Sequence, residues 1–172
     1  MAEMQMDILL LRAIFIWEKQ WFLLTCGDIH KKDYNSMTVA WGSFGHIWNI
    51  PFAQVVVRHS RYTYQFMEKY DSFTLCSFHE KYRKNLKTLG SKSGRDGDKI
   101  AESGLTPMPS KTITAPGFAE AGVIIECQKI YWDDMKPAHF LDKGILKYYK
   151  NDDYHRIYYG KILSITRNDQ NS

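Results

Sequence analysis

The chain has 172 residues and a formal net charge of +4, so it fits one domain and leaves no room for a second of ordinary size. Hydrophobic residues make up 44% and charged residues 24%, which excludes general disorder. The positive charge is too mild to indicate a nucleic-acid-binding protein, and we expect no nucleic-acid partner.

Cysteines and histidines give no sign of a metal site. Cys26, Cys76 and Cys127 are far apart and form no C-x-x-C pair, which favours reduced thiols and a cytoplasmic location. The six histidines form no H-E-x-x-H motif, so we predict no bound metal. Motifs for a nucleophilic serine, a Walker loop and a doubly wound dinucleotide domain are also absent from the sequence.

The chain begins with a leader, residues 1–20, whose structure the sequence leaves open. Its apolar run at residues 8–17 is interrupted by Arg12 and is shorter than the roughly 20 residues of a membrane helix. We therefore predict no membrane segment, and the leader could be a docking segment, an interface helix or poorly ordered. Residues 21–167 form the predicted domain, and residues 168–172 form a polar tail.

The domain is rich in predicted strands. Short apolar or alternating runs bounded by glycine, proline and polar residues indicate strands. They lie at residues 21–25, 37–44, 52–57, 72–78, 122–131 and 155–166. Strands at these intervals favour a closed antiparallel barrel.

Two short helices are predicted between the strands. Thr63 is placed to cap a helix that runs to Tyr70, with Tyr62 and Met67 as a hydrophobic staple. A second helix is predicted over residues 80–89, with Gly90 in position to end it. Residues 90–97 and 104–117 are predicted as surface loops.

Residues 58–63 are the strongest local signal for a ligand. Arg58 and Arg61 can match phosphate oxygens, the hydroxyl groups of Ser60 and Thr63 can donate to them, and a helix N-terminus follows. The motif predicts a phosphate cradle. A capped surface helix with two solvated arginines explains the spacing equally well.

Two weaker signals flank this motif in the sequence. Residues 90–95 could form an anion nest with Lys99 near it, although a mobile basic loop explains them better when they are read alone. The strand edge at residues 35–42 offers backbone donors beside Trp41 and could hold a flat heteroaromatic ring. An ordinary barrel strand with a packed tryptophan is the alternative.

Taken in order, these segments resemble the flavin reductase-like FMN-binding split-barrel proteins, close to the flavoredoxins. The resemblance rests on N-x-M-T-x-x-W-G at residues 35–42, R-x-x-R-Y-T at 58–63 and K-S-G-R-D-x-D-K at 92–99. It extends over roughly residues 21–164. The sequence departs from that family in its apolar leader.

The resemblance implies a mainly β fold, a six-stranded antiparallel Greek-key split barrel with a few short peripheral helices, and a homodimer with FMN near the subunit interface. The cofactor-binding residues that it implies are Asn35, Met37, Thr38, Val39, Ala40, Trp41, Arg58, Ser60, Arg61, Tyr62, Thr63, Ser77, Phe78, Ser91, Lys92, Ser93 and Lys99.

It also implies an oxidoreductase that passes electrons from a reduced donor, NAD(P)H, through FMN to a flavin, a metal complex or a protein. The flavin N5 would carry the chemistry and no side chain would act as a catalytic residue. A flavoredoxin-like electron carrier and a non-catalytic FMN-binding module are the alternatives, because the fold alone does not fix the activity.

Overall fold

A computed structural model describes residues 14–168 of the chain. Its main feature is a seven-stranded antiparallel sheet with the order β2-β1-β5-β8-β9-β4-β3. The strands are β1 (Phe22–Asp28), β2 (Asp33–Val39), β3 (Gly42–Ile47), β4 (Ile50–Arg58), β5 (Ser72–Ser77), β8 (Val123–Asp134) and β9 (His155–Arg167). A small second sheet pairs β6 (Pro107–Met108) with β7 (Gly117–Phe118).

The predicted mainly β architecture is confirmed, but the main sheet has seven strands where six were expected, and β6 and β7 form a second sheet. Each of the six predicted runs contains strand, but the run at residues 37–44 is divided into the end of β2 and the start of β3. Ala40 and Trp41 separate them, because there the chain leaves one edge of the sheet and begins the strand at the other edge. This crossing carries Trp41 past the mouth of the barrel.

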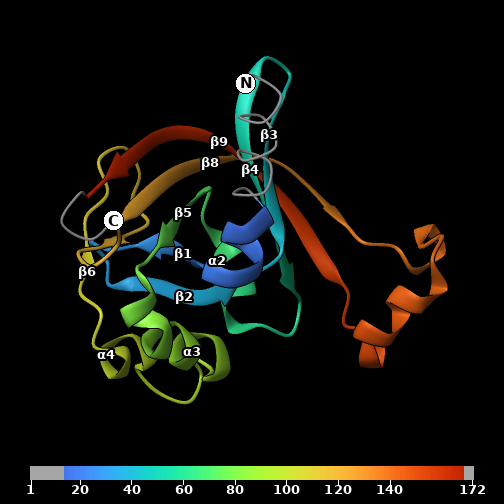
Figure 1. The fold of residues 1–172 in the computed structure, drawn as a ribbon, viewed down its shortest axis with the longest axis horizontal. Coiled ribbons are helices and arrows are strands. Elements are labelled where there is room, and N and C mark those ends of the chain that lie inside the picture. The colour runs from blue at the N-terminus through green and yellow to red at the C-terminus, as the bar shows by residue number, and fades with distance from the viewer. Residues whose placement is uncertain (1–13, 169–172) are drawn as a thin grey trace, which may run out of the picture.

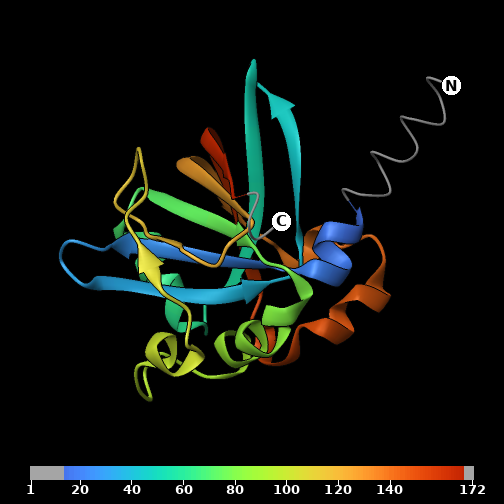
Figure 2. The ribbon, with the colours of Figure 1, turned by 60° about the vertical axis from the view of Figure 1, so that its left-hand side comes forward.

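Strands β3 and β4 form a long hairpin that projects from the barrel (Figures 1 and 2). Ile47 pairs with Ile50, and the two residues between them, Trp48 and Asn49, both have positive φ angles of 52° and 57°. Two consecutive positive φ angles define the tight turn that suits the twist of a β-hairpin. The hairpin thereby exposes Trp48 at its tip, with 59% of its surface accessible.

Helix α2 (Tyr62–Lys69) follows the first arginine motif, but its N-terminus differs from the prediction. The N-cap is Arg61 in an extended conformation, without a side-chain cap, and Thr63 already lies inside the helix. The Thr63 hydroxyl instead accepts a hydrogen bond from Asn35 Nδ2 at 2.7 Å. The predicted Thr63 cap is therefore wrong, because that hydroxyl is used to join α2 to β2.

The second predicted helix is divided into a 3-10 turn, η2 (Glu80–Tyr82), and α3 (Arg83–Ser91). Gly90 does not end α3, which continues to Ser91. A Cβ atom on Gly90 would lie 3.1 Å from the Thr38 Cβ, so this glycine permits close packing of α3 on β2. A further short helix, α4 (Lys99–Ser103), was not predicted; Asp98 caps it by accepting from Ile100 N and Ala101 N.

Two apolar clusters fill the molecule. The larger lies within the curved sheet and contains Phe22, Leu75 and Tyr158; the smaller lies beneath α3 and α4 and contains Leu86 and Phe118. The short π-helical turn η1 (Ile16–Gln20) packs on the larger cluster through Trp17, whose ring centre lies 4.8 Å from that of Phe22. The remainder of the leader, residues 1–13, and residues 169–172 of the tail lie outside the described residues.

Strands β8 and β9 are joined by a long connection, residues 135–154, which we call the excursion. It contains three 3-10 turns: η3 (Pro137–His139), η4 (Lys143–Tyr148) and η5 (Lys150–Asp152). Figure 1 shows it in orange, extending away from the sheet and returning to it. Its return brings the start of β9 beside the end of β4, where His155 pairs with Arg58.

The packing makes a direct prediction for stability. Leu75 is fully buried in the larger cluster, so Leu75→Ala should lower the free energy of unfolding by about 2–5 kcal/mol through lost burial and a residual cavity. Leu141→Ala makes the same change at a side chain that is 97% exposed, and it should cost less than about 0.5 kcal/mol. Urea unfolding of both variants measures the difference; equal losses would contradict this description of the core.

Candidate functional site

The candidate site is a cavity of about 270 Å³ where β2, β4 and β9 approach one another. It is lined by Met37, Thr38, Val39, Ala40, Trp41, Val56, Arg58, Arg61 and His155. Strand β2 is at one edge of the sheet, whereas β4 is next to the other edge. The cavity therefore exists because the sheet curls until its two ends face each other.

Seven of the residues named from the sequence meet in this cavity. Residues 37–41 supply one wall as a continuous stretch of chain, and two arginines, Arg58 and Arg61, lie on the opposite side. The arrangement offers a wall of strand-edge backbone and mixed apolar and polar side chains beside two cations. A planar ligand with an anionic tail fits such a surface better than a compact polar molecule does.

His155 lines the cavity and was not identified from the sequence. Its ring centre lies 5.3 Å from that of Trp41, and its Nδ1 is 3.1 Å from the Tyr149 hydroxyl oxygen. Burial, and next the nearby Arg58 charge, lower the pKa of His155 to about 4. The ring is thus neutral at neutral pH and can exchange a hydrogen bond with a ligand without adding charge. Only the pairing of β9 with β4 places it there, and no local sequence pattern signals that pairing.

Arg58 is fastened to the excursion. Its Nη2 donates to the Tyr148 carbonyl oxygen at 2.8 Å and its Nη1 donates to the Asp153 carbonyl oxygen at 3.1 Å. Tyr148 also makes an edge contact with Trp41, with ring centres 5.9 Å apart. The excursion therefore forms part of the wall around the cavity mouth.

Arg61 and Lys99 make a second cationic group beside the cavity. Arg61 Nη2 donates to the Gly90 carbonyl oxygen at 2.7 Å, and Lys99 Nζ donates to the carbonyl oxygens of Leu89 and Lys92 at 2.9 and 3.2 Å. Both cations thus bind main-chain oxygens at the C-terminal end of α3, where helix carbonyls lack intrahelical partners. Within residues 14–168, neither forms an ion pair with a carboxylate.

Burial lowers the pKa of both of these cations. Burial, followed by the Arg61 charge, lowers the pKa of Lys99 to about 8. Burial, followed by the Arg58 charge, lowers the pKa of Arg61 as well. Lys99 is only 4% exposed, so a bound anion would relieve an electrostatic cost that the protein alone leaves uncompensated.

Other residues named from the sequence lie in two adjoining hollows. One of about 320 Å³ shares Thr38 and Ala40 with the cavity and adds Ser91. Another of about 500 Å³ is lined by Asn35, Tyr62 and Lys99 on the far side of Arg61. The sequence thus predicted residues of three hollows, to each of which strand β2 contributes part of the lining.

The remaining named residues line none of these three hollows. Ser60 bonds to Asp153, Thr63 is buried against Asn35, and Lys92 forms an ion pair with Glu102. Ser93 accepts a hydrogen bond from Arg95 N in the loop before α4. Ser77 ends β5, and Phe78 after it is buried in the smaller apolar cluster. Their roles in cofactor binding stay predictions.

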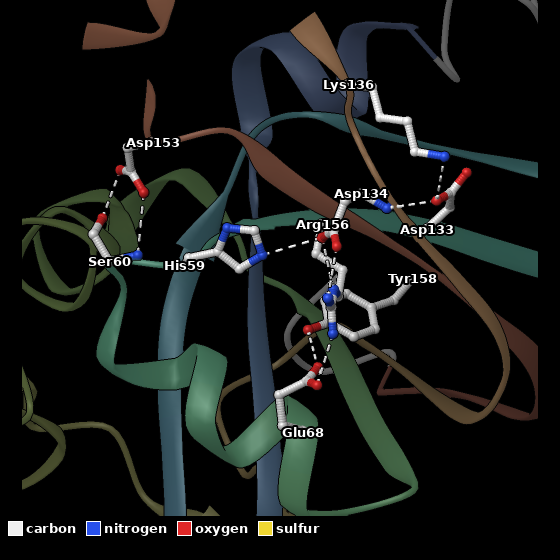
Figure 3. A network of polar contacts seen from close by, with 9 residues as sticks. All are labelled: His59, Ser60, Glu68, Asp133, Asp134, Lys136, Asp153, Arg156 and Tyr158. Atoms are coloured by element: carbon white, nitrogen blue, oxygen red, sulfur yellow. Dashed lines mark hydrogen bonds and ion pairs between the residues drawn. The ribbon is translucent and has the colours of Figure 1, made fainter. Parts of the chain in front are cut away.

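A polar network fixes the chain between Arg58 and α2 (Figure 3). Arg156 on β9 binds both carboxylate oxygens of Asp134 at 2.8 and 2.7 Å and reaches Glu68 on α2 at 2.8 Å. His59 Nε2 lies 3.1 Å from Asp134, and the Tyr158 hydroxyl donates to Glu68 at 2.6 Å. The network joins β8, β9 and α2 behind the arginine motif, so it sets the position of that motif.

Comparison with known protein families shows to which family the chain belongs. A model of the flavin reductase-like domain matches residues 19–172. The chain belongs to the flavin reductase-like family. No curated protein sequence gives a significant match.

Solved structures agree with this family in fold. Flavoredoxin of Desulfovibrio vulgaris (Miyazaki F) superposes with a TM-score of 0.68 at 23% identity, over 88% of this chain and 70% of that one. An FMN-binding domain of a flavin reductase-like enzyme from Shewanella baltica OS155 gives 0.66 at 17% identity, over 92% and 74%. A Shewanella frigidimarina NCIMB 400 protein described as having a split barrel domain gives 0.67 at 16%, over 92% and 73%. The fold is therefore the split barrel of this flavin reductase-like family.

The described residues contain neither a candidate metal site nor a candidate membrane-spanning helix. Within residues 14–168, no cluster of three or more His, Cys, Asp or Glu side chains could hold a metal ion. No helix in that part of the chain is long and apolar enough to cross a bilayer.

The network in Figure 3 predicts a pH effect on stability. Hydrogen bonds from Arg156 hold the pKa of Asp134 below its ordinary value of 3.8. Because the folded-state pKa lies below the unfolded-state pKa, the interaction stabilises the fold above about pH 4 and is lost as the pH falls through the folded-state pKa. Asp134→Asn should therefore be less stable at neutral pH and lose less further stability on acidification.

Asp133→Asn is the matched control for this prediction. Asp133 is adjacent on β8 but accepts no hydrogen bond from Arg156, so its variant should keep the acid sensitivity of the parent. Urea midpoints of the three proteins, measured from about pH 7 down to about pH 3, provide the test. Parallel pH curves for Asp134→Asn and the parent would contradict the assignment.

Proposed function

We propose that this flavin reductase-like chain binds FMN in the cavity between β2, β4 and β9 and acts as an oxidoreductase. Electrons would come from a reduced donor, NAD(P)H, and leave to a flavin, a metal complex or a protein. The observation that carries the proposal is the juxtaposition of the wall at residues 37–41 with the cations Arg58, Arg61 and Lys99. The free, buried thiols fit the cytoplasmic location expected for such an enzyme.

The residues present fit FMN by their chemistry. FMN joins a planar ring system to a dianionic phosphate, and the cavity joins a strand edge to a cationic side. Residues 37–41 would support the ring, while Arg61 and Lys99 would neutralise the phosphate. When bound, FMN would supply hydride acceptance and onward electron transfer, which no side chain here can supply.

The protein's own contribution is to position and shield. The neutral His155 ring and the Trp41 indole border the cavity, and Tyr148 of the excursion closes part of its mouth. A reductant held among these rings would be kept close to the ligand and away from bulk water, which favours transfer over side reactions. His155 could hold a proton donor or acceptor in place because it carries no charge at neutral pH.

An anaerobic absorbance titration tests the proposed activity. The purified protein, loaded with FMN, should lose its yellow colour within one turnover when NADH or NADPH is added, and should recover it with an electron acceptor. A protein that retains FMN but is bleached by neither nucleotide would instead be a flavoredoxin-like carrier or a binding module. Failure to retain FMN at all would overturn the proposal.

The phosphate assignment is tested by removing the two arginines of the motif. Arg58→Ala with Arg61→Ala should weaken FMN binding by at least tenfold, since each charge-assisted contact contributes about 1.5–3 kcal/mol. Riboflavin, which lacks the phosphate, should bind as it does to the parent. Lys161→Ala removes a charge from an exposed position on β9 and serves as the control. Fluorescence titration of the three proteins with each flavin measures the affinities; an unchanged FMN affinity in the double variant would refute the assignment.

A homodimer is the second part of the proposal, and an exposed aromatic stripe supports it. Trp48 and Tyr131 are 59% and 46% exposed, and the ring of Trp48 lies 6.2 Å from that of Tyr131. The stripe continues through Tyr159, whose ring is 5.7 Å from Tyr131, to Phe52. Exposed aromatic rings on adjacent strands are typical of protein interfaces, and a twofold axis would let the stripe cover itself.

Sedimentation velocity of a stripe variant tests the homodimer. Trp48→Lys should weaken dimerisation by roughly thirtyfold or more, since a buried interface tryptophan contributes about 2 kcal/mol or more. Leu141→Lys places the same charge on an exposed side chain outside the stripe and should leave the assembly unchanged. A parent that sediments as a monomer at all concentrations would contradict this part of the proposal.

A further inference from the structure

Three groups of the turn after β4 converge on one carboxylate. Ser60 N and Ser60 Oγ donate to the two oxygens of Asp153 at 3.2 and 2.6 Å, and Arg58 Nη1 lies 3.8 Å from Asp153 Oδ2 (Figure 3 shows the Ser60 contacts). A main-chain amide, a hydroxyl and a guanidinium are the groups that proteins use to bind phosphate. Asp153 therefore occupies an anion site of the protein as a resident anion.

The backbone that carries these donors is held in place independently of Asp153. Arg58 is the last residue of β4, and the turn closes with a hydrogen bond from Arg61 N to Arg58 O at 3.1 Å. His59, between Arg58 and Ser60, is tied on the other side to Asp134. An external anion would therefore find the Ser60 amide and hydroxyl in the same place once Asp153 had left, with the Arg58 side chain freed from the excursion's carbonyl oxygens to bind it.

Asp153 belongs to the excursion, which is fastened to the barrel at this point. Besides the carboxylate contacts, Arg58 binds the carbonyl oxygens of Tyr148 and Asp153, and its guanidinium lies 5.2 Å from the Tyr149 ring centre. Away from this attachment the excursion is open to solvent, with Leu141 97% exposed. Arg58 and Ser60 thus provide the polar anchor of a segment whose apolar attachment is the buried ring of Tyr149, 5.5 Å from that of His155.

The backbone just before Asp153 adopts an unfavourable conformation. Asn151 and Asp152 both have positive φ angles, 56° and 54°, in the left-handed region that non-glycine residues seldom occupy. Two such residues in succession cost free energy that the anchor must offset. Loss of the anchor would therefore also release the strained backbone.

We propose that Asp153 is an internal competitor for the anion site at Arg58 and Ser60, and that a phosphate-bearing ligand displaces it and loosens the excursion. The proposal rests on the proposed FMN function only for the identity of the ligand. Since the effect is reciprocal, the carboxylate that holds the excursion closed also weakens the binding of the ligand phosphate. Asp153 would then control both the affinity of the site for the phosphate-bearing ligand and the attachment of the excursion beside the cavity.

Asp153→Asn tests the competition, with Asp152→Asn as its matched control. Asparagine keeps the size and one acceptor but removes the charge. Among the residues that the structure describes, the hydrogen bond of the Asp152 side chain is the one it accepts from the Tyr154 hydroxyl at 3.3 Å. Asp153→Asn should bind FMN roughly tenfold tighter, the effect of one charge-assisted contact, and riboflavin unchanged. Asp152→Asn should match the parent for both flavins. An Asp153→Asn affinity for FMN that is unchanged or weaker would overturn the proposal, the weaker case indicating that Asp153 positions Arg58.

Limited trypsin digestion of the parent protein tests the loosening without any variant. Lys143, Lys147 and Lys150 lie in the excursion, and all three are exposed. FMN and millimolar inorganic phosphate should both speed cleavage there, while riboflavin should not. Cleavage that is slowed or unaffected by both anions would overturn the proposal. If the parent binds neither flavin, the FMN function fails, and the phosphate arm still decides whether the anion site controls the excursion.

Discussion

The bending of the two longest strands, β8 and β9, is the constraint on which the candidate site depends. Their pairing shifts register twice, between Glu126 and Cys127 and between Lys129 and Tyr131. Such irregularities bend a strand pair and increase its twist. On β9, Gly160 allows the close approach this curvature needs, because a Cβ there would lie 2.6 Å from the Phe73 ring. The curl brings the start of β9 opposite the end of β2, which a flat sheet of the same order would hold far apart.

Once the sheet has closed in this way, electrostatics decides what the cavity can accept. Lys99 and Arg61 sit on the carbonyl groups at the end of α3 without a carboxylate to balance them within residues 14–168. Carbonyl dipoles offset only part of the free energy lost when a cation is removed from water. The lowered pKa of Lys99 reflects this desolvation. The fold thus holds two charges in a state that an anionic ligand would stabilise. The positions of the half-buried Arg61 and the buried Lys99 therefore favour a bound phosphate more strongly than the basic composition of the loop at residues 90–97 does.

Much of the fold could be read from the sequence because local patterns determine strands and turns. All six predicted runs contain strand, and most of the predicted loop at residues 90–97 lies between α3 and α4, whereas the predicted loop at residues 104–117 contains β6 and reaches β7. The errors arise where tertiary contacts override local signals. Thr63 looks like a helix cap, but the buried amide of Asn35 takes its hydroxyl. Gly90 looks like a helix stop, but it serves the close packing of α3 against Thr38.

The same limit explains which site residues were found. Residues 37–41 and the two arginines lie in contiguous motifs, so a sequence pattern could identify them. His155 enters the cavity only through the antiparallel register that pairs it with Arg58, and the structure places Ser60 against Asp153, more than ninety positions away in the chain. No spacing rule in one sequence predicts either contact. Both depend on the path of the excursion, which has no regular pattern of its own.

The two arginines of one short motif end up with different tasks, and the reason is geometric. Arg58 completes β4 and faces the excursion, so its guanidinium already has two carbonyl partners and a nearby carboxylate. Arg61 begins α2 after the chain has turned, and it faces the end of α3, where it meets only a carbonyl. Three residues of spacing therefore separate a cation that has a carboxylate within ion-pair distance from one that, within residues 14–168, has none. An incoming dianion should first be attracted by Arg61 and Lys99, which lack such a carboxylate, and it gains Arg58 only at the expense of the excursion's attachment.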